Sequence, residues 1–330
     1  MIRFFRGAGP AEVFLIFLVA TGVWAVAFLH PHYSTTYNYD INPMPFYGFL
    51  KLAFGENALY GVIFSFVLVL FMSLLVVNFN TSQFFINERT FLPGVIYILL
   101  TGLFPSHQLL NPVLPASIFL MIAIRRIMDA YRIPGTAFNF FDASILIGAG
   151  SLLYANLVWF ELLVIIGIII LRTVNIKELV ISIIGFITPT LITYGLYYVL
   201  GKDIASLPVI FYNNLFYVSD KFIFSAPAIA GLILLGLMIL ISIVYLLSHL
   251  STKKIKSRKT FTELIWAVVI SFVVYFALPS VSVELLWLAA IPISYILAHF
   301  LIFTKKKIVP EIFFAVLFLI IIGMQIWSLK

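Results

Sequence analysis

Cysteine is absent from the 330 residues, which excludes disulfide bonds, thiolate metal sites and cysteine nucleophiles. Charge is also scarce: charged residues make up 10% of the chain, whereas they make up about 25% of a soluble domain. Apolar residues make up 63%, above the roughly 45–50% of soluble domains. This composition excludes a soluble globular protein, and the length leaves no room for a large soluble domain beside membrane spans.

The signature motifs of several enzyme classes are missing as well. No glycine-rich loop ends in a Walker lysine, no glycine fingerprint follows a strand, and no histidine pair has the helical spacing of a zinc site. The net charge of +7 does not indicate nucleic acid, because no basic stretch is interleaved with base-stacking aromatic residues. We therefore expect no nucleic-acid partner.

Long apolar runs dominate what is present. A helix that spans a bilayer needs about 20 apolar residues. On that rule the sequence predicts an all-α, polytopic membrane protein with about eleven spanning helices, near 11–29, 59–78, 91–105, 111–125, 139–154, 157–171, 179–200, 226–248, 262–278, 285–303 and 311–328. The third to sixth segments are short, and prolines punctuate the third and fourth, so nine or ten spans is the alternative count.

The basic residues orient this arrangement. Sixteen of the twenty Lys and Arg lie in alternate gaps between the apolar runs, and the other four are Lys51, Lys202, Lys221 and Lys330. Because short loops rich in Lys and Arg stay in the cytoplasm, we expect the N-terminus inside and the C-terminus outside. No small-x-small cleavage site follows the first apolar run, so we expect it to be an uncleaved signal anchor.

Two outward segments, at about 30–58 and 201–225, are long enough to fold over the membrane surface. The first contains an amphipathic stretch from Phe46 to Phe54, and the second contains LPVIFYNNLFYV. Both stretches suit helices that lie in the membrane interface. We expect residues 1–330 to form a single transmembrane domain with these two longer periplasmic loops.

Asp40 and Glu56 are the carboxylates of the first outward segment. A carboxylate there could deprotonate an acceptor hydroxyl or hold a divalent cation, the one cofactor that we consider. The alternative is that both are solvated loop charges, with Asp40 capping a turn before Pro43. His107 lies in a tight outward turn, on the face where Asp40 is expected.

Glu161 is the most unusual charge, because it lies a few residues inside an apolar run. Intramembrane carboxylates are costly and usually face a cavity or a partner; the alternative is a glutamate that reaches headgroup water. Lys202 and Lys221 could attract a lipid phosphate as point charges. His299, in the tenth apolar run, is expected to be a hydrogen-bonded packing residue. The basic run 252–259 is expected to lie against anionic headgroups.

Several stretches resemble a known superfamily. They are FDASILIGAGSLLY at 141–154, the apolar span that ends at Leu171 and Arg172, the following ISIIGFITPTLITYGLYYVL, RTFLPGVIYILLTGLFP at 89–105 and LLWLAAIPISYILAHF at 285–300. This pattern is similar to the middle of the GT-C superfamily, polytopic glycosyltransferases that use polyprenyl-phosphate sugars. The whole chain more closely resembles an uncharacterised family of integral inner-membrane proteins from Bacteroidota.

The GT-C resemblance implies transfer or assembly of a lipid-linked sugar at the periplasmic face. It implies that Asp40 is the catalytic base or a metal ligand, and we expect Glu56, His107 and Glu161 to line the substrate cavity. Many GT-C members have paired acidic residues where Asp40 stands between Tyr39 and Ile41, and their large C-terminal periplasmic domain is missing here. A noncatalytic scaffold or membrane-protein partner in an envelope complex is therefore an alternative. A secondary transporter is less favoured, because the chain shows no internal symmetry.

Overall fold

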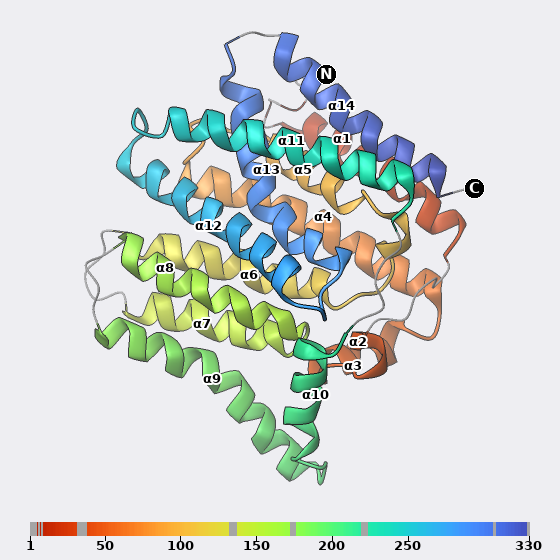
Figure 1. Cartoon of the computed structure of the whole chain (residues 1–330), viewed down its shortest axis with the longest axis vertical. Coiled ribbons are helices and arrows are strands. Elements are labelled where there is room, and N and C mark those ends of the chain that lie inside the picture. The colour runs from red at the N-terminus through yellow and green to blue at the C-terminus, as the bar shows by residue number, and fades with distance from the viewer. Residues whose placement is uncertain are drawn as a thin grey trace.

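The computed structural model describes residues 5, 7, 9–31, 38–131, 137–171, 176–218, 224–305 and 308–328. Within these ranges the chain is helical and contains no strand (Figure 1). A helix occupies each of the apolar segments in which we predict a span: α1 (Pro10–Leu29), α4 (Ala58–Gln83), α5 (Leu92–Thr101), α6 (Val113–Asp129), α7 (Ala137–Ser151), α8 (Glu161–Leu171), α9 (Ile176–Val199), α11 (Ala226–Ser248), α12 (Ile255–Ala277), α13 (Leu286–Phe303) and α14 (Ile308–Trp327).

Seven of these helices are long and apolar enough to cross a membrane, so the protein is a multi-pass membrane protein. They are α1, α4, α9, α11, α12, α13 with the short turn before it, and α14. The other four are the segments that the sequence marks as short. At 1.5 Å per residue the 10 residues of α5 extend about 15 Å, which is half of a hydrocarbon core of roughly 30 Å.

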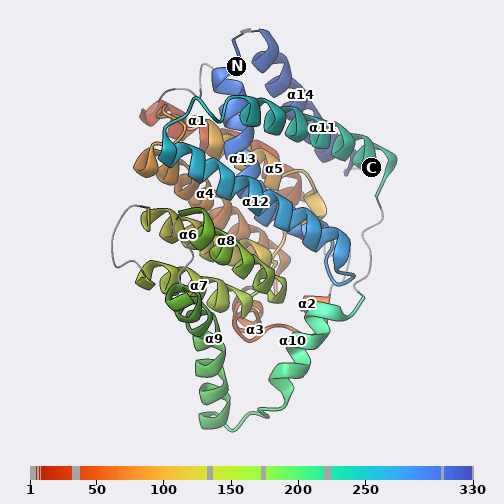
Figure 2. The ribbon, with the colours of Figure 1, turned by 60° about the vertical axis from the view of Figure 1, so that its left-hand side comes forward.

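Three shorter helices lie in the two segments expected to be outward loops. They are α2 (Asn38–Ile41), α3 (Pro45–Phe54) and α10 (Ser206–Phe216). The helices predicted in these two segments are thus confirmed as α3 and α10. Pro45 lies in the first turn of α3, where its missing N–H leaves no helical hydrogen bond unmade. Figures 1 and 2 show α2, α3 and α10 together at one end of the bundle, which we call the α3 end.

The centre of the bundle is formed by α5 and α13. All ten residues of α5 are buried, and so are 94% of the residues in the apolar window of α13. The longer helices surround this pair with one side facing inward and the other exposing apolar residues, as expected for a bundle in lipid. A sequence that is apolar on all sides of a helix indicates only that the helix is buried. The central position of α5 and α13 is therefore known only from the structure.

Helix α9 is the least buried of the long helices. It packs on α7 where two glycines allow close approach: a Cβ added to Gly185 would lie 2.6 Å from the Phe141 carbonyl oxygen, and one added to Gly148 would meet the Phe186 carbonyl. The rest of α9 is exposed and apolar, and α9 and α10 project from the bundle (Figure 2). Such a surface suits contact with acyl chains.

Candidate functional site

A break between α5 and α6 is the most unusual backbone feature of the bundle. Residues 102–112 contain a single 3-10 turn, η2 (Pro105–His107), and nearly all of the segment is buried. Backbone polar groups that are buried outside a helix leave a free-energy cost unless they are hydrogen-bonded. The carbonyl and N–H groups of the break therefore need partners from the surrounding helices.

Side chains from three surrounding helices donate hydrogen bonds to carbonyl groups of the break. The donors and their carbonyl acceptors are Gln325 to Gly102 at 2.7 Å, Ser65 to Leu109 at 2.9 Å and Tyr47 to Leu110 at 3.4 Å. Asn111 lies at the end of the break and accepts from the backbone N–H groups of Val113 and Leu114, both at 3.1 Å. This side-chain oxygen caps α6, so the helix restarts at a defined residue.

Asp40 lies in α2, next to the break. The Tyr47 hydroxyl that bonds Leu110 also lies 3.3 Å from Asp40 Oδ1. Lys51 donates to the Asp40 carbonyl at 2.8 Å, and its Nζ lies 3.9 Å from the carboxylate. The Asp40 side chain is 22% exposed, so it is held by two neighbours and still reached from outside.

His107 lies within the break itself and is 5% exposed. Burial lowers the pKa of its imidazole to about 4, so the ring is neutral at neutral pH. The ring packs edge-on at 6.1 Å from the ring of Phe104. His107 thus lies in the same short segment as Leu110, whose carbonyl accepts from Tyr47, the neighbour of Asp40.

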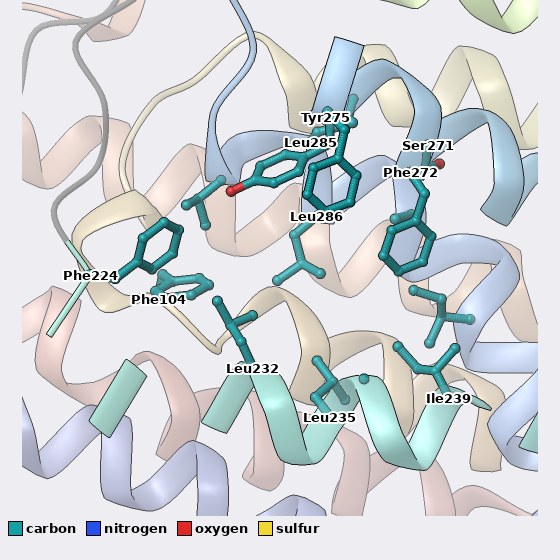
Figure 3. Close-up of a pocket in the computed structure, with 15 residues that line it drawn as sticks. Phe104, Phe224, Leu232, Leu235, Ile239, Ser271, Phe272, Tyr275, Leu285 and Leu286 are labelled. Carbon is teal, nitrogen blue, oxygen red and sulfur yellow. The ribbon is translucent and has the colours of Figure 1, made fainter. Parts of the chain in front are cut away.

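An apolar pocket of about 250 Å³ lies between α11, α12 and α13 (Figure 3). Phe104 of the break and Phe224 form one end of it. Phe272 and Phe276 also line it and are 46% and 78% exposed, so the pocket borders the lipid-facing surface of α12. An apolar cavity stays dry and accepts hydrocarbon. Its volume is below the roughly 300–1,000 Å³ of sites for whole drug-sized ligands, which suits one part of a chain.

Two hydroxyl groups line this pocket, and they differ in where they point. Ser271 donates to the Ala267 carbonyl of its own helix at 2.8 Å. The Tyr275 hydroxyl points into the pocket, toward Phe104 and Phe224 (Figure 3). Tyr275 therefore supplies a polar group at the end of an otherwise apolar site.

Glu284 is a buried carboxylate directly behind the pocket wall. It lies in η4 (Val283–Leu285), between two residues that line the pocket, and is 2% exposed. Its Oε1 accepts from the Tyr154 hydroxyl at 3.1 Å and from the Ser282 N–H at 3.0 Å. The sequence does not single out this residue, because the predicted apolar span 285–303 begins one residue later. The available signal was an acid between valine and leucine.

A chain of polar contacts joins the same wall to both outward segments. Asn156, in η3 (Ala155–Phe160), donates to Asn214 O at 3.3 Å and lies 3.5 Å from Ser280 Oγ. Asn214 of α10 in turn donates to the Asn42 carbonyl at 2.8 Å. These contacts hold α10 and the α12–α13 turn against the first outward segment. The pocket, the break and Asp40 therefore share one end of the bundle.

The other predicted site residues lie away from the pocket. Glu161 begins α8 and accepts from Ser144 of α7 at 2.6 Å, so it faces protein and not lipid, but it does not line the pocket. Glu56 is exposed in the α3–α4 turn. Lys202 is exposed, with Nζ 5.4 Å from the Tyr197 ring and 5.9 Å from the Phe49 ring. Lys221 lies outside the described residues.

Among the residues that the structure describes, no group of three or more His, Asp or Glu side chains could hold a metal ion.

His299 is buried, and among the described residues neither of its ring nitrogens has a hydrogen-bond partner. The expectation of a hydrogen-bonded histidine is therefore wrong. His299 packs against the rings of Phe261 and Phe303 at 5.0 and 4.9 Å.

Comparison with known proteins gives one match. Residues 44–330 match the model of a family of unknown function, DUF6427. Searches of curated proteins and of solved structures find no match. The expected membership of an uncharacterised family is thus confirmed, while the GT-C resemblance and the bacterial group stay predictions.

Proposed function

We propose that this protein, which belongs to the family of unknown function DUF6427, binds a lipid-linked sugar and transfers or assembles it at the periplasmic face of a bacterial inner membrane. The hydrocarbon chain would enter the pocket between α11 and α12, and its sugar-phosphate end would lie over the break near Asp40. One observation carries the proposal. Phe104 of the break lines the apolar pocket, while Leu110 of the same break accepts from Tyr47, the partner of Asp40.

The proposed chemistry is attack of an acceptor hydroxyl on the sugar carbon that bears the phosphate. Asp40 takes the hydroxyl proton as the new carbon–oxygen bond forms, and the polyprenyl phosphate leaves with the electrons of the broken bond. Tyr47 orients the carboxylate, because its hydroxyl is fixed between Asp40 and the break. Lys202, exposed at the same end, and Lys221 attract the phosphate as point charges.

The topology that we propose has eleven crossings with the N-terminus inside. Two contacts support the crossing of the four short helices. The turn between α5 and α6 reaches α3 through the bond from Tyr47 to Leu110, and the turn after α7 reaches α3 through the 3.0 Å bond from Phe46 N–H to the Leu152 carbonyl. Both turns therefore lie at the α3 end, whereas Arg126 and Asp142, 3.8 Å apart, join α6 to α7 near their opposite ends.

The test is Asp40→Asn, which keeps the size and polarity of the side chain but removes proton acceptance. Transfer of radiolabelled sugar from a panel of undecaprenyl-phosphate-linked sugars, measured in membrane vesicles, should fall by about 10²–10⁴-fold. Protein level and membrane insertion should stay normal. Asp203→Asn, in the exposed turn before α10, is the matched control and should keep full transfer. Full transfer by the Asp40→Asn protein would remove Asp40 as the base.

A noncatalytic partner subunit of an envelope complex is the second candidate, and the surroundings of Asp40 favour it. The carboxylate is already held by Tyr47 and Lys51, which is how a purely structural acid would be bound. In that case Asp40→Asn and Lys51→Met should both lower the protein level, and envelope function should fall only in proportion. Loss of function at unchanged protein level would favour the enzyme.

A further inference from the structure

The end of α11 and α12 opposite the α3 end contains a lysine in an aromatic cradle. Lys253 lies in the turn between α11 and α12, and its Nζ lies 5.2 Å from the centre of the Phe261 ring and 5.0 Å from that of Phe303. Within the described ranges no carboxylate pairs with it. The side chain is partly buried, and burial lowers the pKa of its amine. A half-buried cation thus lies between two aromatic rings, with no carboxylate partner among the described residues.

The neighbouring ionisable groups are basic. Lys254 and Lys305 are exposed beside the cradle, and the buried His299 lies near enough for its charge to interact with those of Lys253 and His249. The nearest acid along α12, Glu263, is buried on another side: its Oε1 lies 3.3 Å from where a Cβ on Gly167 of α8 would stand. The local field is therefore positive, and an anion would complete it.

The turn also adjoins an apolar surface of α11 that acyl chains can contact. It lies where α11 ends and α12 begins, so its depth is that of the lipid headgroups if both helices cross the bilayer. Immediately below it, α11 exposes Val244 and Leu247, which are 57% and 52% accessible. A phosphate bound at Lys253 would have its acyl chains against this surface. A free phosphate ion would make no use of it.

We infer that the α11–α12 turn binds the phosphate of an anionic membrane phospholipid, with Lys253 as the specific contact and the rings of Phe261 and Phe303 as its walls. Basic pockets between transmembrane helices on the cytoplasmic side bind such headgroups. The inference is independent of the proposed transfer reaction, because Asp40, the break and the pocket lie toward the other end of these helices.

The experiment uses the full-length protein purified in a zwitterionic detergent and titrated with phosphatidylglycerol, phosphatidylcholine or inorganic phosphate. Bound lipid is counted by native mass spectrometry. We expect retention of phosphatidylglycerol but not of phosphatidylcholine. Lys253→Gln should weaken phosphatidylglycerol binding by about ten- to a hundredfold, the loss of one charge-assisted hydrogen bond. Lys254→Gln, an equal loss of charge on the next and exposed residue, should leave it unchanged.

Three results would overturn the inference. Equal weakening by Lys253→Gln and Lys254→Gln would mean attraction by the basic surface as a whole. Undiminished binding by the Lys253→Gln protein would exclude Lys253. Competition by inorganic phosphate at equal concentration would indicate a free anion in place of a lipid. Lys253→Arg keeps the charge and the ring contacts, so this variant should retain the lipid. It also keeps the test decisive if the Lys253→Gln protein does not fold.

Discussion

At the residue scale, polar groups could be recognised from sequence when they lay in polar surroundings. Asp40 and His107 were singled out, and both lie at the break. Glu284 was not, although it is hydrogen-bonded and adjoins the pocket wall. Its partner Tyr154 is 130 positions away in the chain, and hydropathy averaged over a window cannot reveal such a pair. Long-range partners decide which intramembrane acids are structural.

His107 predicts a specific dependence of stability on pH. Burial lowers its pKa from 6.5 to about 4, so the unfolded chain takes up a proton before the folded one does as pH falls. The stability that comes from keeping this ring neutral is complete above pH 6.5 and is lost between pH 6.5 and 4. From pH 7 to 4.5 the free energy of unfolding should fall by about 2–3 kcal/mol more in the wild type than in a His107→Gln protein.

Denaturant unfolding in detergent micelles at both pH values checks this. Carboxylates also titrate over the same range, but they do so equally in both proteins, so the difference between the two isolates His107. If the wild type and the variant lost the same free energy on acidification, the imidazole would have a normal pKa or a partner that stabilises its charged form.

At the scale of helices, the apolar runs predicted where the long helices lie, and the two longer loop sequences predicted α3 and α10. The break at 102–112 was only suggested by the prolines around it. It depends on donors such as Ser65, Tyr47 and Gln325, which reach it from three other helices. The pocket was not predictable, because α11, α12 and α13 form it from side chains that are ordinary apolar residues in each separate run.

Filling the pocket tests whether it holds hydrocarbon. Gly236 lines it, and nothing lies within 4 Å of a Cβ added there, so Gly236→Phe should fold with its ring in the pocket. Binding of an undecaprenyl-linked sugar should weaken at least about tenfold, since burial of several methylene groups at about 0.8 kcal/mol each is lost. Gly195→Phe is the matched control, because Gly195 also has open space but lies on exposed α9. Equal binding by both variants would place the chain elsewhere.

At the scale of the whole molecule, the order of the seven long helices is compatible with the orientation that the basic residues predict. An even number of short helices, α5 to α8, separates α4 from α9. The long helices therefore alternate in the same way whether the short ones cross the membrane or form hairpins within it. This is why positive charge predicts which end of α9 lies inside and yet does not distinguish seven crossings from eleven.

Truncated fusions to a reporter that is active only in the periplasm test the orientation and the number of crossings separately. Fusions after Lys51 and Lys221 should be active, and those after Arg132 and Lys256 should be silent, because basic loops stay in the cytoplasm. Equal activity at the two kinds of position would overturn the orientation.

A fusion after Gln108 decides the number of crossings. It is active if α5 and the break cross the membrane together, and silent if they form a hairpin from the inside. We expect it to be active, because the adjoining Leu109 and Leu110 carbonyls bind Ser65 of α4 and Tyr47 of α3, at the end of the bundle where Lys51 lies.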